Sequence, residues 1–234
     1  MKIAIMQPYF FPYIGYFQLL SLVDHFVVYD NIEFTKKGWI HRNRILVDGH
    51  DVYISLPLKS DSDFLDVRDR RLADIWMKER KTLLNRVANA YRRAPNFDVV
   101  YSLFEKCILV NETNLFGFLY HSLVLINDYL QITTPLTVSS TLSIDHELKA
   151  GKKVLAICKT MHATDYVNPI GGLRLYDKAD FKKEGVDLYL LQSPGFVYRQ
   201  FGHDFVPNLS ILDVMMFNSI EEIRKYLISS YTLI

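Results

Sequence analysis

The sequence predicts an α/β fold whose strands form a mostly parallel sheet. Two short apolar runs, residues 2–6 and 25–30, enclose one helical stretch, and a connection this short fits only a tight right-handed crossover between parallel strands. A second β–α–β–α–β pattern occupies residues 133–192. We therefore predict a single domain in three parts: a first α/β half with a hairpin (1–59), a helical insert (60–132), and a second α/β half with C-terminal helices (133–234).

The elements of the first half follow from their residue patterns. Residues 2–6 are β-branched and apolar, as in a buried strand, and residues 14–22 place apolar side chains on one helical face. The stretch RNRILVDGHDVYISLPL alternates in polarity on both sides of Asp48-Gly49, which is a strong two-residue turn signal. This stretch predicts a β-hairpin that ends at Pro57.

The middle of the chain is helical and basic. Residues 66–93 carry nine Lys or Arg against four acids, so their net charge is +5, and Pro95 ends the expected helix. The charged side of this helix is either a solvated outer face or a surface that meets the phosphates of a ligand. The remaining expected elements are helices at 97–109, 113–130 and 145–163, strands at 133–144, 164–169 and 186–192, and two helices within 208–231.

Composition excludes several classes of protein. With 234 residues, 23% charged residues and a net charge of +1, the chain has no global field that favours nucleic acid or a membrane surface as a partner. Its two cysteines lie in apolar helical settings without metal-ligand spacing, so we expect neither a disulfide nor a metal site. We find no signal peptide and no apolar run long enough to span a membrane, so a cytoplasmic location is expected.

The first candidate site is the loop QPYFFPYIG, which follows the first strand. Its prolines fix their own φ angles and bias Gln7 to an extended conformation, while Gly15 allows a close backbone approach at the start of the helix. Backbone N–H groups at such a helix start bind anions well. The alternative is an ordinary strand-to-helix connection whose aromatic residues belong to the core.

The second candidate site is the stretch YDNIEFTKKGWIHRNRI, residues 29–45. Lys37 and Arg42 suit phosphate, and Trp39 suits stacking on a base or a sugar. His41 is a candidate general base near neutral pH, and Asp30 stands at a strand end, where catalytic and ribose-binding acids occur. The alternative is a polar approach to the hairpin, which explains the charge but not the presence of Trp39.

The third candidate site is the stretch YVNPIGGLRLYD in the second α/β half. Gly171 and Gly172 directly follow a strand, and Asn168 precedes them, so backbone could contact a ligand here. Both loops would open at the same edge of the sheet, where open α/β folds bind ligands. The sequence contains no GxSxG, Walker, GxGxxG or HExxH motif, which disfavours a triad hydrolase, a P-loop kinase and a zinc protease.

Three long motifs carry a resemblance to a known family. The stretches IAIMQPYFFPYIGYFQLL, DHFVVYDNIEFTKKGWIHRNRI and YVNPIGG closely resemble the WbqC-like family of bacteria, over nearly the whole chain. Members of that family occur in gene clusters for O-antigen and other surface polysaccharides. The resemblance implies an enzyme whose substrate is a nucleotide-linked sugar, often an amino sugar, that receives an acyl or aminoacyl group such as glycine.

A weaker resemblance concerns the nucleotidyltransferase superfamily. Its first loop carries His-x-x-His or His-x-Gly-His on the phosphates of ATP, and the corresponding residues here run from Pro12 to Tyr16. Gly15 is kept, but Tyr13 and Tyr16 stand where the histidines should be. This resemblance implies a Rossmann-like parallel sheet, while the missing imidazoles, which stabilise charge on the transferring phosphate, put nucleotidyl transfer in doubt.

Three functions remain open. In the first, an enzyme forms an amide on the amino group of a nucleotide-linked sugar, with His41 or Asp30 as the base; if it activates its own acid, it needs ATP and magnesium. The second is a nucleotidyl- or adenylyl-transferase that uses ATP and magnesium, and the third is a non-catalytic partner in a polysaccharide assembly complex. The expected substrate-binding residues are Gln7, Tyr13, Gly15, Tyr16, Lys37, Trp39, Arg42, Asn43, Asn168, Gly171 and Gly172.

Overall fold

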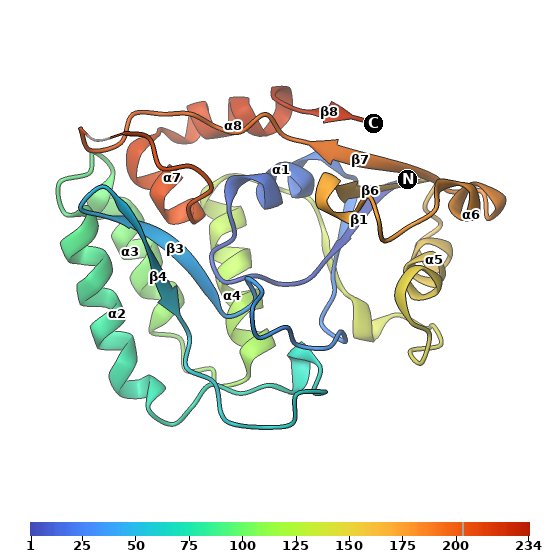
Figure 1. The fold of residues 1–234 in the computed structure, drawn as a ribbon, viewed down its shortest axis with the longest axis horizontal. Helices are drawn as coiled ribbons and strands as arrows, with labels where there is room; N and C mark the ends of the chain where they lie inside the picture. Colours follow the sequence, from blue (N-terminus) through green and yellow to red (C-terminus); the bar gives the residue numbers. More distant parts are fainter. Residues whose placement is uncertain (203) are drawn as a thin grey trace.

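A computed structural model describes residues 1–202 and 204–234, and its larger sheet has six strands, which lie in the right half of the molecule in Figure 1. The strand order is β5-β2-β1-β6-β7-β8, in which the first five strands are parallel and β8 pairs antiparallel with β7. This confirms the predicted α/β class and the mostly parallel sheet. The strands are β1 (Lys2–Met6), β2 (His25–Val28), β5 (Leu136–Val138), β6 (Asp165–Pro169), β7 (Asp187–Gln192) and β8 (Thr232–Leu233).

The order of the parallel strands determines where a ligand can bind. Counted along the chain, the five parallel strands lie in the order 3-2-1-4-5, which is a doubly wound arrangement of the Rossmann type. The order reverses between β1 and β6, and in such sheets ligands bind outside the carboxyl ends of the strands at this switch point. The first and third candidate loops follow β1 and β6, so they flank the switch point.

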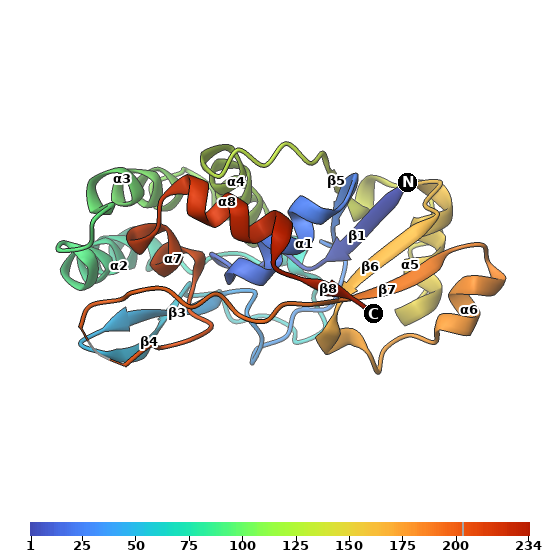
Figure 2. The same ribbon diagram turned by 90° about the horizontal axis from the view of Figure 1, so that it is seen from above.

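Helices cover both faces of the sheet (Figure 2). On one face, α1 (Ile14–Leu22) and α8 (Ile220–Ser229) pack against side chains such as Ala4 of β1. On the other face, α5 (Ala150–Thr160) and α6 (Lys178–Lys183) pack against Ile3 and Ile5, which flank Ala4 in β1. The two faces therefore receive alternate residues of each strand, as the pleat of a strand requires.

The helical insert and the hairpin lie beside the sheet, to the left in Figure 1. Buried side chains of both regions belong to one continuous apolar cluster that includes Phe26 of the sheet and Phe104 of the insert. Within the described residues, no helix is long and apolar enough to cross a membrane. The elements of this region are β3 (Arg42–Val47), β4 (His50–Ser55), α2 (Trp76–Tyr91), α3 (Phe97–Ile108), α4 (Leu115–Tyr129) and α7 (Ile211–Phe217).

The prediction of a long helix at 66–93 is wrong for residues 66–75, because α2 begins only at Trp76. The preceding residues pair with distant backbone instead: the Leu72 N–H donates to Thr113 O (2.8 Å), and the Ala73 N–H donates to Pro57 O (2.9 Å). These long-range hydrogen bonds override the local helical pattern. The expected strand at 133–144 is likewise reduced to Leu136–Val138.

Candidate functional site

The loop after β1 holds a bulky residue in an unfavourable backbone conformation. Phe11 has φ +44°, in the left-handed region that costs free energy for any residue with a side chain. Residues remote in sequence hold it there: the Asn43 amide donates to Phe10 O (3.0 Å) and Phe11 O (2.7 Å), and the Ser210 hydroxyl donates to Phe11 O (2.8 Å). The hairpin and the start of α7 thus fix the shape of this loop.

Most aromatic residues of this loop are core residues. Phe10 and Phe11 are fully buried, and Tyr16 is 2% exposed, so Tyr16 does not reach a surface where it could contact a substrate. Burial raises the pKa of the Tyr16 hydroxyl well above its ordinary value. Tyr13, in contrast, is 39% exposed. The expectation that the loop contributes a substrate-binding wall therefore concerns Tyr13 and its half-buried neighbour Tyr9.

A hollow of about 590 Å³ lies at the switch point; we call it the switch-point hollow. It is bounded by the start of α1, the ends of β6 and β7, and residues 193–202 and 204–209, which we call the strap. The strap crosses the hairpin in Figure 2. Tyr13 precedes α1 without capping it through its side chain, and no other side chain of the described residues accepts a hydrogen bond from the first N–H groups of this helix. Gly15 and Gly171 line the hollow from its two sides.

Gly15 has a steric reason to be glycine. A Cβ atom at this position would lie 2.4 Å from Cε2 of the Tyr13 ring. The absence of a side chain therefore allows the Tyr13 ring to lie across the first turn of α1.

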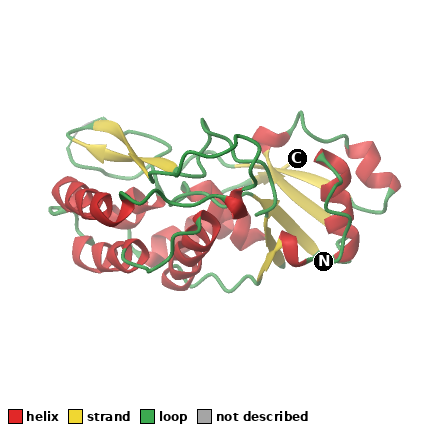
Figure 3. Cartoon of the chain, turned by 90° about the horizontal axis from the view of Figure 1, so that it is seen from below, coloured by secondary structure: helices red, strands yellow, loops and turns green. Residues whose placement is uncertain are grey.

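A second hollow of about 400 Å³ adjoins the first and shares Tyr13 and Asn208 with it; we call it the Trp39 hollow. Trp39 is 38% exposed, and its ring stacks on that of Tyr53 at an interplanar angle of 18°. The Arg44 guanidinium lies 5.4 Å from the centre of the Trp39 ring and pairs with Asp51 at 2.8 Å. The hollow thus combines an aromatic face with an arginine. Loops gather in this region between the hairpin and the sheet (Figure 3).

Lys37 and Arg42, expected to bind a diphosphate, line none of the described hollows. Lys37 is exposed, and Arg42 uses its guanidinium to donate to the backbone oxygens of Gly38 (3.2 Å) and Lys37 (2.6 Å). The arginine that reaches the Trp39 hollow is Arg44, which the sequence analysis missed. The sequence did contain a signal for Arg44: in a β-strand, residues 42 and 44 project on the same side, so an expectation for Arg42 applies to Arg44 as well.

The two candidate bases lie apart from each other and from both hollows. Asp30 is 2% exposed, and its carboxylate accepts from the Ser139 hydroxyl (2.8 Å) and from the Ser140 N–H and hydroxyl (2.9 and 2.6 Å). These hydrogen bonds tie the end of β2 to the end of β5. His41 lies beside α2, where burial and, less strongly, the charge of Arg42 lower its pKa.

The remaining predicted residues differ in their relation to the two hollows. Asn168 is 5% exposed, and a Cβ atom at Gly172 would lie 1.8 Å from its Nδ2 atom, so these two residues pack closely under the turn that presents Gly171. Asn43 lines the Trp39 hollow, but its amide holds the loop after β1. Gln7 is half-buried and lines none of the described hollows.

The strap is fixed to the core by a buried carboxylate. Asp213 is fully buried and accepts hydrogen bonds from the Tyr91 hydroxyl (2.8 Å), the Tyr198 hydroxyl (2.5 Å) and the Gln200 amide (2.8 Å). Burial raises the pKa of Asp213 despite these donors. Tyr198 also lines the switch-point hollow, and no sequence motif had singled it out.

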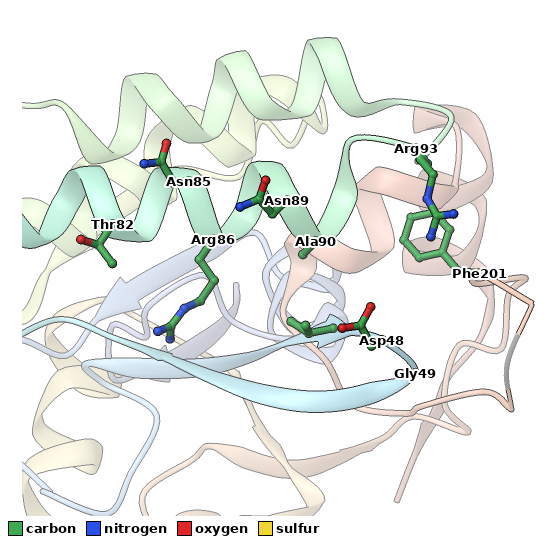
Figure 4. Close-up of a pocket in the computed structure, with 10 residues that line it drawn as sticks. Asp48, Gly49, Thr82, Asn85, Arg86, Asn89, Ala90, Arg93 and Phe201 are labelled. Carbon is green, nitrogen blue, oxygen red and sulfur yellow. The ribbon is translucent and has the colours of Figure 1, made fainter.

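The basic helix α2 borders a separate hollow of about 500 Å³ beside the hairpin turn (Figure 4). The Arg86 guanidinium donates to Tyr53 O (3.3 Å), and that of Arg93 lies 5.5 Å from the centre of the Phe201 ring. This hollow shares no lining residue with the switch-point or Trp39 hollow. Binding of a ligand's phosphates by α2 therefore stays a prediction. In residues 1–202 and 204–234, no group of three or more His, Cys, Asp or Glu is placed to hold a metal ion.

Comparison with known proteins adds a family. The model of the WbqC-like protein family matches residues 7–225. The chain is also 30% identical over 232 residues to the uncharacterized protein Rv1507c of Mycobacterium tuberculosis (strain ATCC 25618 / H37Rv), and this alignment covers 97% of each chain. No solved structure matches the chain.

Proposed function

The chain belongs to the WbqC-like protein family, and we propose that it binds a nucleotide-linked sugar across the switch-point and Trp39 hollows. In this proposal it is an enzyme of bacterial surface polysaccharide synthesis that transfers an acyl or aminoacyl group to an amino group of the sugar. The observation that carries the proposal is the joining of the two hollows at Tyr13, directly outside the switch point of a doubly wound sheet.

The shape and chemistry of the hollows support a nucleotide ligand. Their volumes, about 590 and 400 Å³, are within the range of small-molecule sites. The first N–H groups of α1 lack a side-chain cap and suit a phosphate oxygen, as at other helix N-termini. Arg44 would neutralise further phosphate charge, and Trp39 and Tyr13 would stack on the base or the sugar.

The proposal modifies the roles expected from the sequence. Tyr13, Gly15, Trp39 and Gly171 keep their substrate-binding roles, and Arg44 takes the role expected of Arg42. The described residues that line the two hollows include no histidine, aspartate or glutamate.

Thermal shift with a panel of ligands tests the proposal. The panel contains dTDP-, UDP-, GDP- and CDP-linked sugars and ATP with magnesium. Selective stabilisation by one class of nucleotide-linked sugar is the expected result. Stabilisation by ATP with magnesium alone would favour a nucleotidyl- or adenylyl-transferase, and no shift with any ligand would favour a non-catalytic assembly partner.

Two stacked aromatic residues provide a matched pair of variants. Trp39 lines the Trp39 hollow, whereas its stacking partner Tyr53 does not. We expect Trp39→Ala to weaken binding of the nucleotide-linked sugar about tenfold, because base–aromatic stacking contributes about 1–3 kcal/mol. Tyr53→Ala removes the same stack and should leave the affinity, measured by isothermal titration calorimetry, within about twofold of the wild type. Equal losses in both variants would contradict the assignment.

A further inference from the structure

A third hollow, of about 410 Å³, lies at the start of α5, and we call it the α5 hollow. The loop after β6 separates it from the switch-point hollow: Gly171 lines the switch-point hollow, and Tyr176 lines the α5 hollow. It therefore opens on the sheet face covered by α5 and α6, opposite to that covered by α1. None of the roles derived above uses this hollow.

Two lysines line one side of the α5 hollow. Lys153 is 5% exposed, its Nζ donates to Asn31 O (3.0 Å), and it lies 5.4 Å from the centre of the Tyr29 ring. A lysine ammonium has three donors, so this hydrogen bond leaves two of them for another partner. Lys149, one turn earlier, is exposed and lines the same hollow. Burial lowers the pKa of Lys153, while the nearby carboxylates of Asp66 and Asp30 act in the opposite direction.

Two carboxylates line the hollow as well. Glu33 and Asp66 are held next to each other by an antiparallel bridge between their backbones. Among the described residues, neither carboxylate forms an ion pair with Lys149 or Lys153 within 4.0 Å. The ion pair that Asp66 makes is a long one, 3.9 Å from the Nε of Arg68. Charges of both signs therefore face one space without a direct ion pair between these lysines and these carboxylates.

This arrangement selects for a ligand that carries both charges. A simple anion would be attracted by the two lysines but repelled by Glu33 and Asp66. A simple cation would be attracted by the two carboxylates but repelled by the lysines. A zwitterion can satisfy both sets at once. The aromatic side chains of Tyr29, Tyr176 and Phe64, which also line the hollow, suit a small apolar group on such a ligand.

We propose that the α5 hollow binds a free α-amino acid, with its carboxylate toward Lys149 and Lys153 and its ammonium toward Glu33 and Asp66. Binding here does not depend on the proposed function, because the two sites share no residue. If the function is as proposed, the amino acid is placed on the other side of the same sheet edge as the nucleotide-linked sugar.

Blocked amino acids test the proposal directly. A thermal-shift panel of the twenty common amino acids, at millimolar concentration and pH 7.5, first identifies the tightest one. Isothermal titration calorimetry then compares it with its N-acetyl derivative, which keeps only the anion, and its amide, which keeps only the cation. We expect both derivatives to bind at least tenfold more weakly. Equal binding by either derivative, or no binding by any amino acid, would overturn the proposal.

Neutral variants locate the binding in the α5 hollow. Lys153→Met keeps an apolar stem of similar length and should weaken amino-acid binding at least tenfold, as should Asp66→Asn. Lys182→Met, at an exposed site on α6, is the control and should not change the affinity. If Lys153→Met fails to fold, the exposed Lys149→Met replaces it, with an expected loss of about threefold. Unchanged affinity in a folded Lys153→Met variant would contradict the assignment.

The failures of the two proposals can be told apart. Trp39→Ala should leave amino-acid binding unchanged, and Lys153→Met should leave binding of the nucleotide-linked sugar unchanged. Loss of amino-acid binding in Trp39→Ala would mean that the amino acid does not bind in the α5 hollow.

Discussion

The switch-point hollow and the α5 hollow lie on opposite faces of one sheet edge, yet they are built from different side chains. Aromatic and aliphatic residues, prolines and glycines line most of the first, together with Ser193 and Asn208, and none of its described lining residues is charged. Two lysines and two carboxylates line the second. The comparison teaches what each proposal requires: the proposed phosphate site would depend on backbone N–H groups that the topology supplies and on Arg44, whereas the proposed zwitterion site would depend on charged side chains.

The largest expected effect is that of Gly15→Val, which should weaken binding at the switch-point hollow but not at the α5 hollow. In Gly15→Val, the new Cβ would displace the Tyr13 ring, which it approaches to 2.4 Å. We expect binding of the nucleotide-linked sugar to weaken about a hundredfold, or about 2.7 kcal/mol, in calorimetric titration. Amino-acid binding at the α5 hollow should stay the same.

Gly151, near the start of α5, provides the matched control. A Cβ atom there would make an ordinary contact, 3.6 Å from the Tyr176 ring. Gly151→Ala should therefore leave binding of the nucleotide-linked sugar intact. A Gly15→Val variant that binds this ligand as tightly as the wild type would show that the start of α1 is not part of the site.

The next largest effect is on the free energy of unfolding. It concerns the hydrogen bonds that hold the loop after β1, a loop that does not line the α5 hollow. Asn43→Ala removes both amide hydrogen bonds that hold Phe10 O and Phe11 O. We expect the free energy of unfolding, measured in urea, to fall by about 2 kcal/mol, because buried carbonyls lose their donors. Asn85→Ala, an exposed change on α2, is the control and should stay within about 0.5 kcal/mol of the wild type. Similar stability of the two variants would mean that Asn43 does not hold the loop.

The smallest effect concerns the strap and its dependence on pH. Burial raises the pKa of Asp213 above its ordinary value of 3.8, so the folded protein keeps this proton at pH values where the unfolded chain has lost it. The contribution to stability is full below pH 3.8 and is lost as the pH rises through the folded pKa.

A neutral variant isolates that contribution. Asp213→Asn cannot titrate, so the difference in unfolding free energy between wild type and variant should change with pH in the same window. Parallel pH profiles of the two proteins, measured by urea unfolding, would contradict a raised pKa at Asp213.

The sequence predicted those features that depend on local pattern. The parallel sheet, the hairpin around Asp48-Gly49 and the loop after β1 all follow from periodicity and turn residues, and the structure confirms them. Tyr13, Gly15 and Gly171 reach the switch-point hollow because they flank strand ends, which topology brings together.

Features that depend on distant contacts escaped prediction. The backbone of residues 72–73 pairs with residues 57 and 113 instead of continuing a helix. Tyr16, an expected substrate-binding residue, is buried by the surrounding core. Arg42, expected to bind phosphate, instead donates to the backbone oxygens of Lys37 and Gly38, and Arg44 is the arginine that lines the Trp39 hollow. Tyr198 reaches the site through the strap, whose course is fixed by the buried carboxylate of Asp213.

Tryptophan fluorescence offers the most direct test of the nucleotide-linked sugar site. The chain has two tryptophans; Trp76 is 2% exposed, whereas Trp39 is 38% exposed and lines the Trp39 hollow. Titration with the nucleotide-linked sugar that gives the largest thermal shift should produce saturable quenching in the wild type, because the base stacks on Trp39. Trp39→Phe should abolish this quenching. Equal quenching in the variant, or binding that leaves the fluorescence of the wild type unchanged, would place the ligand elsewhere and contradict the proposed site.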